Sequence, residues 1–423
     1  MKKIALGASL VALAAAGYVL AAGGGAGSGG AARLITLASG GSAAKPGAPA
    51  VAATPAPSGR LIAAAAGKGI PDSYICVFKK GEVSPSGARG AAAEAARRGG
   101  GSLGHVYTTA LQGFSISIPA QAAQVLMDKN PNIAWCEQDQ EIVLIDGVSA
   151  TAGNTGGTTT QPVESTPPGI TAVNGGAYIG TNRAFVIDTG IDLTHPDLNV
   201  EPVNCNGGSC NFVTRETSPQ DLNGHGTHVS GTIAAKAGNG IGVVGVAAGA
   251  RVIAVRVLNK RGSGSNSDVI AGVDYVSRVG RAGDVANMSL GGSLSTALDT
   301  AVLNASAVVK FALAAGNETD DANNHSPGRV NGPNIYTIAA MSWNATSRTG
   351  TWASFSNYNT SIVDYIEPGV SILSTWLNGG YNTISGTSMA TPHMAGILLT
   401  GAPKAGGTVT RTGTSEVYTI GTR

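Results

Sequence analysis

The sequence predicts an α/β protein in which a parallel sheet is covered by helices on both faces, preceded by a small α+β domain of ferredoxin-like topology. From Gly169 onward, short and nearly continuous apolar runs alternate with amphipathic stretches. Parallel strands buried on both faces have this apolar character, and crossover helices separate them. We expect strands at 184–187, 252–257, 285–290, 308–315 and 335–340, and helices at 225–237, 268–279, 294–305 and 388–399. Ligands of such sheets bind at the carboxyl ends of the strands.

The smaller domain is expected over residues 71–146. Its elements follow the order βαββαβ, which is the split motif of ferredoxin-like domains. The expected strands are 73–78, two within 104–118, and 133–136, and the expected helices are 88–98 and 119–130. The first and last strands of this topology are neighbours in the sheet.

Composition restricts the class of protein. Only 12% of the 423 residues are charged and the formal net charge is +2, whereas an average globular protein has about 25% charged residues. A nucleic-acid binder is excluded, because neutralising phosphates needs a dense basic surface. Hydrophobic residues make up 43% of the chain, which is enough to form a large core.

The amino terminus indicates export. Lys2 and Lys3 precede an apolar run over 4–22, and small residues follow it. This order is typical of a secretory signal peptide, so we expect residues 1–22 to be removed and the protein to be secreted, extracellular or periplasmic. The run is also long enough to span a bilayer, and an uncleaved anchor is the alternative. Residues 23–70 are rich in Ala, Gly, Ser and Pro and predict a low-complexity linker.

Four cysteines agree with an exported chain, where an even number suggests two disulfides. A turn sequence between Cys205 and Cys210 can bring these two together, which leaves Cys76 with Cys136. That second bond is reasonable if the first and last strands of the small domain are neighbours in the right register. Buried free thiols are the alternative. A metal site is not supported, because no CxxC spacing is present.

Two residues have the chemistry of an acid–base pair. Asp188 ends the strand expected at 184–187, and a carboxylate there can hold a histidine tautomer and stabilise its charged form. His225 stands between glycines at a helix start and has the pKa range of a general base. The alternatives are a capping aspartate and a zinc pair formed by His225 with His228, but no HExxH pattern supports zinc.

Two further residues suit acyl transfer. Ser388 lies at a helix start in the run Ser-Gly-Thr-Ser-Met-Ala-Thr-Pro-His, where serine can also be a simple cap. Ala390 replaces the last glycine of GxSxG, which argues against a lipase or esterase fold. Asn317 follows the strand expected at 308–315, and its amide can donate to a developing oxyanion. The alternative for Asn317 is a turn residue.

Together these segments resemble a known family. Val-Ile-Asp-Thr-Gly at 186–190, Gly-His-Gly-Thr-His-Val at 224–229 and Gly-Thr-Ser-Met-Ala-Thr-Pro-His at 386–393 look like the three signature blocks of subtilisin-like serine proteases, in the same chain order. The segments 262–267, 287–292 and 354–358 resemble the proteinase K-like branch. The likeness covers about residues 167–400, and residues 71–146 are similar to the inhibitory propeptide of this family.

The resemblance implies a subtilisin-like fold and a serine endopeptidase. It implies that Ser388 is the nucleophile, that His225 is the general base and then acid, and that Asp188 orients His225. Asn317 would complete the oxyanion hole. The residues expected to flank an extended substrate are Gly262, Ser263, Gly264, Ser289, Leu290 and Gly291, and those expected to line the primary specificity pocket are Ala314, Ala315 and Gly316. These small pocket walls imply broad specificity with a preference for apolar or aromatic side chains.

The resemblance also implies an organisation and a set of partners. Residues 71–146 would be an inhibitory propeptide that also aids folding, 147–168 a linker with the maturation site, and 169–402 the catalytic domain. Residues 403–423 are expected to form a polar, loosely packed tail. The implied partners are protein or peptide substrates and the chain's own propeptide, without nucleic acid, and the protein is expected to be a monomer.

The sequence departs from the family pattern at two places. The family usually has a Trp-Gly pair near the amino terminus of the mature enzyme, and the corresponding residues here are Pro168-Gly169. The sequence therefore does not locate the maturation site. No carboxylate stands in 340–344, where the family holds a calcium ion, so that site is in doubt and the metal residues stay unknown. Asp320 and Asp321 are an alternative pair of calcium ligands, and the other interpretation of this pair is surface charge. No cofactor is expected for the chemistry itself, and the alternative function is a non-catalytic binding protein on the same fold.

Overall fold

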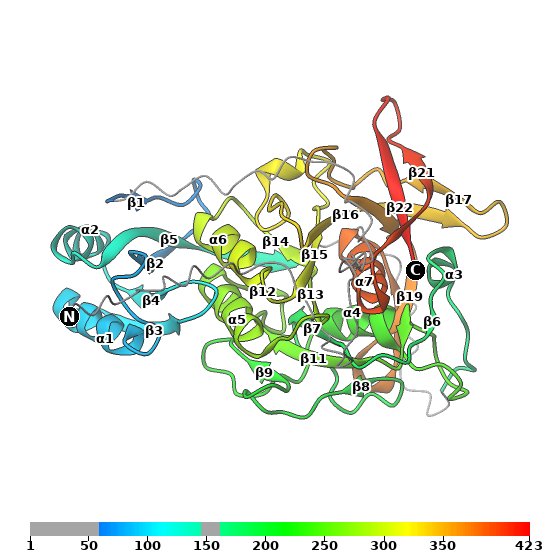
Figure 1. Ribbon diagram of the computed structural model, residues 1–423, viewed down its shortest axis with the longest axis horizontal. Coiled ribbons are helices and arrows are strands. Elements are labelled where there is room, and N and C mark those ends of the chain that lie inside the picture. The colour runs from blue at the N-terminus through cyan, green and yellow to red at the C-terminus, as the bar shows by residue number, and fades with distance from the viewer. Residues whose placement is uncertain (1–58, 145–160) are drawn as a thin grey trace, which may run out of the picture. The chain divides into compact units, whose positions relative to one another are not determined.

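The computed structural model describes residues 59–144 and 161–423 (Figure 1). The predicted signal peptide, most of the first linker, the last two residues of the predicted small domain and residues 147–160 of the second linker lie outside the described residues. Within the described segments, no helix has the length and apolar character needed to cross a bilayer.

The largest sheet has parallel strands at its centre. Within the described residues it contains eleven strands, whose main path runs β21-β22-β18-β16-β15-β13-β7-β11-β8. The central strands are β7 (Arg183–Asp188), β11 (Arg251–Arg256), β13 (Val285–Met288), β15 (Lys310–Ala314), β16 (Ile335–Asn344) and β18 (Tyr365–Pro368), and each pairs with its neighbours in parallel. The outer strands are β8 (Asn199–Val200), β9 (Cys210–Asn211) and β17 (Thr349–Trp352).

Helices cover both faces of this sheet, as the sequence predicts. Alternate residues of β7 point to opposite faces, so Phe185 and Ile187 join one core while Ala184 and Val186 join the other. The first core contains α5 (Asn266–Val279) and α6 (Thr296–Ala305), and the second contains α4 (His225–Ala234) and α7 (Thr387–Thr400). Figure 1 shows the two helix pairs on opposite sides of β7, β13 and β15.

Some element ends differ from the expected ones. The run expected as a single strand at 285–290 divides at Ser289 into β13 and β14 (Leu290–Gly291), because β14 pairs outside the main sheet. Helix α6 begins at Thr296 rather than at residue 294, because the Ser295 hydroxyl accepts a hydrogen bond from Leu298 N–H as the N-cap. The remaining described elements are short: α3 (Pro168–Ala172), β6 (Gly176–Ala177), β10 (Ala247–Ala248), η1 (Ala322–Asn324), β19 (Ile372–Thr375), η2 (Leu377–Gly379) and β20 (Tyr381–Ile384).

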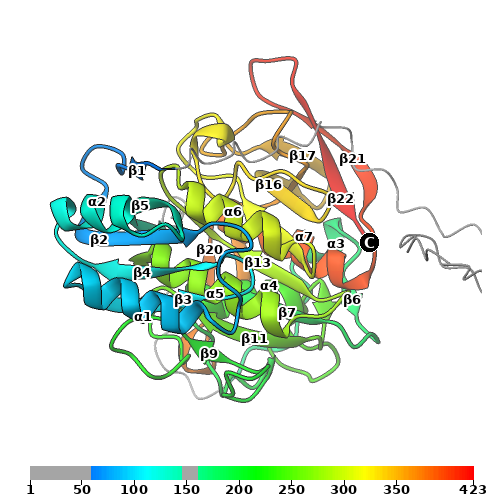
Figure 2. The ribbon, with the colours of Figure 1, turned by 60° about the vertical axis from the view of Figure 1, so that its left-hand side comes forward.

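The small domain has the expected element order and one extra strand. Its elements are β1 (Leu61–Ile62), β2 (Gly69–Phe78), α1 (Ala88–Gly99), β3 (Ser102–Tyr107), β4 (Gly113–Ser117), α2 (Ala120–Lys129) and β5 (Ile133–Leu144). The sheet order is β1-β5-β2-β4-β3, and α1 and α2 pack on one face (Figure 2). Its other face contributes Ile75 and Val77 to the core shared with α5 and α6.

Two boundaries of the small domain differ from the expected ones. The linker expected to continue to residue 70 is folded from Leu61 onward, because β1 adds to the edge of β5 in parallel register. Strand β5 does not end at Cys136 but continues to Leu144, where it pairs with β12 (Ser263–Ser265) and β14. Beyond Cys136, β5 also pairs with strands of the larger domain. The pattern of apolar residues within the small domain therefore does not predict this part of the strand.

The prediction of a loosely packed tail is wrong. Residues 404–422 form a hairpin of β21 (Lys404–Thr410) and β22 (Val417–Thr422), which is red in Figure 2. Strand β22 extends the main sheet by pairing with β18. Val409, Tyr418 and Ile420 are buried in a core with Ile366. The polar composition of the hairpin reflects its exposed outer strand, whereas a few alternating apolar residues are sufficient to anchor it.

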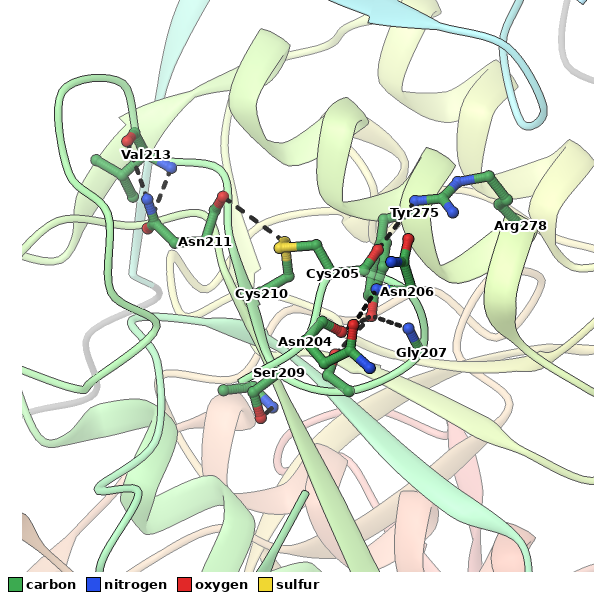
Figure 3. The surroundings of a disulfide bond; sticks show 12 residues. Asn204, Cys205, Asn206, Gly207, Ser209, Cys210, Asn211, Val213, Tyr275 and Arg278 are labelled. Carbon is green, nitrogen blue, oxygen red and sulfur yellow. Dashed lines mark hydrogen bonds between the residues drawn. A yellow bond between two sulfur atoms is a disulfide. The ribbon is translucent and has the colours of Figure 1, made fainter. Parts of the chain in front are cut away.

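All four cysteines lie in described segments and form two disulfides, Cys76–Cys136 and Cys205–Cys210. The first joins directly opposed residues of β2 and β5. The second closes a short turn whose backbone is held by Tyr275 of α5: the N–H of Gly207 donates to the Tyr275 hydroxyl, and that hydroxyl donates to the Gly208 carbonyl (Figure 3).

Candidate active site

Asp188 and His225 form a direct hydrogen-bonded pair. Asp188 is the last residue of β7, which lies between β13 and β11, and His225 is the first residue of α4. The His225 Nδ1 atom lies 2.8 Å and 3.0 Å from the two carboxylate oxygens of Asp188. The Thr189 N–H donates to Asp188 Oδ1 over 2.7 Å. Both side chains are buried, so the carboxylate acts on the imidazole with little screening by water.

Ser388 is held at the start of α7 by reciprocal bonds with Ser289. The Ser388 hydroxyl donates to the Ser289 carbonyl at 3.1 Å, and the Ser289 hydroxyl donates to the Ser388 carbonyl at 2.8 Å. Asn287 Nδ2 donates to Ser289 Oγ at 2.9 Å and so orients that hydroxyl. Helix α4 packs against α7, which brings the elements of His225 and Ser388 into one layer.

The orientation of the Asn317 amide is fixed by the first residue of α7. The Thr387 N–H and hydroxyl both donate to Asn317 Oδ1 at 2.9 Å. Because the oxygen of the amide is used as an acceptor, its nitrogen is the donor end. A donor anchored in this way can stabilise a negative oxygen without first having to reorganise.

An extended strand runs between the segments expected to bind substrate. Strand β5 pairs in antiparallel register with β12 through residues 141–143 and with β14 through Val143 and Leu144. The Leu144 N–H donates to the Gly262 carbonyl at 2.8 Å. Gly262 has a φ of +77°, and a Cβ there would lie 2.6 Å from the Leu144 side chain, so glycine permits this close approach.

The three residues expected to line a specificity pocket lie at the end of β15. Ala314 and Ala315 are buried. The Gly316 N–H donates to the Thr387 hydroxyl at 3.3 Å, which connects this segment to the start of α7. A Cβ on Gly316 would lie 2.1 Å from Asn357 Nδ2, so a larger residue would displace the neighbouring loop.

Two acidic residues of β5 that the sequence analysis did not single out cap helices of the larger domain. Glu137 accepts hydrogen bonds from the Ser295 hydroxyl and from the N–H groups of Thr296 and Ala297 at the start of α6. Asp139 accepts from the N–H and the hydroxyl of Ser267 at the start of α5. Their spacing of two residues on a strand places them on one face, and this was the available signal.

Burial changes the proton affinity of these caps. It raises the pKa of the Glu137 carboxyl to about 7, against the hydrogen bonds that favour the charged form. Burial also raises the pKa of Asp139. The carboxyl of Asp299, which is on α6 and interacts electrostatically with Glu137, has its pKa raised by burial to about 7.

Two further polar contacts join the domains along α5. Asp274 accepts hydrogen bonds from the consecutive N–H groups of residues 108–110. His105 Nε2 lies 2.7 Å from Asp268 Oδ1. The sequence analysis missed both because their partners are 163 to 166 residues apart in the chain.

The residues considered as metal ligands have other partners. His228 Nε2 bonds the Ile372 carbonyl, and burial lowers the pKa of His228 to about 3. Asp320 accepts from Asn324 and His325, and Asp321 accepts from Asn359. Among the described residues, no group of three or more His, Cys, Asp or Glu side chains is arranged to hold a metal ion.

Comparison with known proteins connects this geometry to a family. The model of the Subtilase family, Peptidase_S8, matches residues 185–401. The "Extracellular serine proteinase" of Thermus sp. (strain Rt41A) is 39% identical over 79% of this chain and 81% of that protein. "Proteinase R" of Parengyodontium album is 35% identical over 79% of this chain and 80% of that protein. "Alkaline serine exoprotease A" of Vibrio alginolyticus is 40% identical over 69% of this chain and 52% of that protein.

The matched region includes every residue of the candidate catalytic set: Asp188, His225, Asn317 and Ser388. The similarity to the Thermus and Parengyodontium proteins also extends beyond the family model toward the amino terminus, where a propeptide is expected. The chain belongs to the subtilase family, in its proteinase K-like branch, and is a serine endopeptidase with a subtilisin-like fold.

Proposed function

We propose that the chain is an exported, self-processing serine endopeptidase in which Ser388, His225 and Asp188 form the catalytic triad. The observation that supports this most directly is the buried hydrogen bond between His225 Nδ1 and the Asp188 carboxylate. It holds the imidazole in the tautomer whose Nε2 can accept a proton. A carboxylate at this place also stabilises the imidazolium that forms when the proton arrives.

In the proposed reaction, Ser388 Oγ attacks the carbonyl carbon of the scissile peptide while His225 Nε2 takes the hydroxyl proton. Asn317 Nδ2 and the Ser388 N–H donate to the resulting oxyanion. His225 then gives its proton to the leaving amine, the C–N bond breaks, and an acyl-enzyme remains. Water then attacks the acyl carbon while His225 takes a proton from it, the bond to Ser388 Oγ breaks, and His225 returns the proton to the serine oxygen. No step needs a cofactor.

The path of β5 supports a mode of substrate binding. We propose that substrates add as an extended strand between Gly262-Ser263-Gly264 and Ser289-Leu290-Gly291, as β5 does. Ile142 and Leu144 are buried in this position, whereas 46% of the Val143 side chain is exposed. We therefore expect apolar side chains to be preferred at alternate substrate positions. A large apolar or aromatic side chain would enter next to Ala314, Ala315 and Gly316.

The same strand supports a role for residues 71–146 as an inhibitory propeptide. While the peptide groups of β5 pair with β12 and β14, no other polypeptide can pair with these strand edges. We propose that the chain cuts itself between Leu144 and residue 168 and that the small domain then dissociates. The predicted signal peptide and the extracellular relative support the proposed export.

The test uses the full chain with Ser388→Ala, and Ser385→Ala as a matched control from the same segment. We expect Ser388→Ala to remain a precursor, to fail to hydrolyse casein and to resist labelling by an organophosphonate, while the control matures and reacts. Maturation of purified Ser388→Ala without added protease would disprove self-processing. A wild-type chain that matures but neither reacts nor cleaves casein would favour a non-catalytic binding protein. Amino-terminal sequencing of the secreted product would locate both cleavage sites.

A further inference from the structure

Asp221 is a buried carboxylate at the junction of the two elements that hold Asp188 and His225. Its side chain belongs to the loop before α4 and is 1% exposed. Its Oδ1 atom accepts from the N–H of Asn223 (2.9 Å), the N–H of Gly224 (3.0 Å) and the hydroxyl of Thr189 (2.9 Å). Its Oδ2 atom accepts from the N–H and the hydroxyl of Thr227, at 3.0 Å and 2.6 Å.

These bonds complete the start of α4, which has no cap of its own. The N-cap position is Gly224, which has no side chain that could accept a bond. The N–H of His225 instead donates to Asn223 Oδ1, that of Gly226 to Thr189 Oγ1, and that of Thr227 to Asp221 Oδ2. The orphan donors of the first turn are thus satisfied from outside the helix. A negative charge there is also favoured by the helix dipole.

Thr189 connects the hydrogen bonds at the start of α4 to Asp188. It follows Asp188 directly, and its N–H donates to Asp188 Oδ1. Its hydroxyl donates to Asp221 and accepts from Gly226, which is the residue after His225. A continuous chain of hydrogen bonds therefore runs from the Asp188 segment through Thr189 and Asp221 to the first turn of α4. These bonds connect the backbone segment of Asp188 with that of His225.

We propose that Asp221 is a positioning residue that holds His225 against Asp188. This inference rests on the proposed triad and adds to it a fourth side chain that touches no substrate. All five donors to Asp221 are neutral, and four of the five belong to the loop and first turn that carry His225. A displacement of about 1 Å at a reacting group can cost about 100-fold in rate.

The test compares Asp221→Asn with Thr189→Val, and uses Asp197→Asn as the matched control. Asparagine keeps the shape but turns one acceptor into a donor that faces an N–H group, and valine removes the connecting hydroxyl. Asp197 is an equally buried carboxylate that accepts from Asn239, Val243 and Tyr381, away from the start of α4. Thr189→Ser keeps the hydroxyl and serves as the conservative variant.

We expect kcat per active site, counted with an organophosphonate, to fall about 10- to 100-fold in Asp221→Asn, with KM changed less than about 2-fold. The acidic limb of the kcat/KM profile should move to lower pH, because a displaced imidazolium loses stabilisation by Asp188. Thr189→Val should show the same direction, Thr189→Ser should recover most of the loss, and Asp197→Asn should keep its kcat.

A kcat per active site within about 2-fold of wild type and an unmoved pH profile in Asp221→Asn would overturn the inference. If that variant does not fold, the same criterion applies to Thr189→Val, whose side chain is isosteric. Failure of the wild-type enzyme to react with the probe would instead disprove the triad, so the two proposals fail in different ways.

Discussion

At the scale of single residues, the proposed function depends on a few buried polar groups that hydrogen bonds hold in place. Asp188 is buried, and its carboxylate accepts hydrogen bonds from His225 Nδ1 and from the Thr189 N–H. Its negative charge therefore acts on the imidazole. Ser388 is bound to Ser289, and Asn317 to Thr387, on the side of α7. Backbone groups of Thr189, Ser289 and Thr387 bond the side chains of Asp188, Ser388 and Asn317 in that order. These bonds limit the motion that a reaction would have to freeze.

The first prediction concerns Asp188. In Asp188→Asn the amide keeps the volume but presents an NH₂ group to His225 Nδ1, which favours the wrong tautomer. We expect kcat to fall about 10⁴-fold, as in the equivalent change in a protease with the same triad logic. Single-turnover kinetics on a peptide substrate would measure this change, with Asp192→Asn as a buried aspartate outside the pair. A fall of less than about 10-fold would contradict the role of Asp188.

At the scale of elements, strand β5 joins two domains through its carboxyl side chains as well as through its backbone. Glu137 and Asp139 cap α6 and α5, and the strand continues between β12 and β14. A carboxyl group at a helix start accepts hydrogen bonds from N–H groups that have no partner within the helix. The small domain is thus attached at the starts of α5 and α6, where backbone N–H groups need acceptors.

The second prediction concerns the release of the small domain and pH. The pKa of Glu137 is raised by burial to about 7 in the joined state, and its ordinary value is about 4.3. The joined state therefore binds a proton more tightly, and its stability is greatest at low pH and is lost as pH rises through 7. We expect active protease to appear faster after self-processing at pH 8 than at pH 6, measured by hydrolysis of a peptide.

Variants of β5 test this pH dependence. Glu137→Gln cannot ionise, so it should flatten the dependence of the release rate on pH. Glu141→Gln is the matched control, because Glu141 lies on the same strand and is exposed. A release rate that rises equally with pH in both variants would show that Glu137 is not the responsible group.

The third prediction concerns the disulfide between β2 and β5. Its two cysteines are 60 residues apart, so the bond removes much more entropy from the unfolded chain than the Cys205–Cys210 bond, which spans 5. Chain-entropy arguments give about 4 kcal/mol for the first and about 2 kcal/mol for the second. We expect Cys76→Ser with Cys136→Ser to reduce the yield of mature protease more than Cys205→Ser with Cys210→Ser. Equal yields of active-site-titrated enzyme would contradict this order.

At the scale of the whole molecule, the carboxyl-terminal hairpin closes one edge of the main sheet. Ile420 lies opposite Ile366 of β18, and Val409 and Tyr418 complete the core between them. The Arg423 guanidinium donates to the carbonyls of Gly176 in β6 and of Val246, the residue before β10. The hairpin is therefore part of the folded catalytic domain.

The fourth prediction concerns this hairpin. Ile420→Ala removes a buried side chain next to β18, and such changes cost about 2–5 kcal/mol because a cavity remains. We expect faster thermal inactivation and a lower unfolding midpoint with unchanged kcat, because the site lies on other elements. Thr414→Ala in the exposed turn is the control. An unchanged midpoint in Ile420→Ala would mean that the hairpin does not stabilise the domain.

Much of the architecture could be predicted from local patterns. Continuous apolar runs predicted β7, β11, β13, β15 and β16, and the alternation in β4 predicted a half-buried strand, because burial on one or two faces leaves a periodic signature. Tail residues such as Tyr418 and Ile420 left too short a pattern, and their burial depends on a partner strand that precedes them by about fifty residues. The polar contacts of Glu137 and Asp274 likewise have partners that only the fold brings near.

By itself the sequence determined the fold class, the order of elements, the candidate catalytic residues and the family, because motifs and periodicity are local properties of a chain. Tertiary structure alone decided where β5 ends, that residues 404–422 are folded, and that Asp221 and Thr189 connect Asp188 to His225. These features arise from pairing between distant segments. A hydrogen bond or a buried contact has no sequence signature when its partner is unknown.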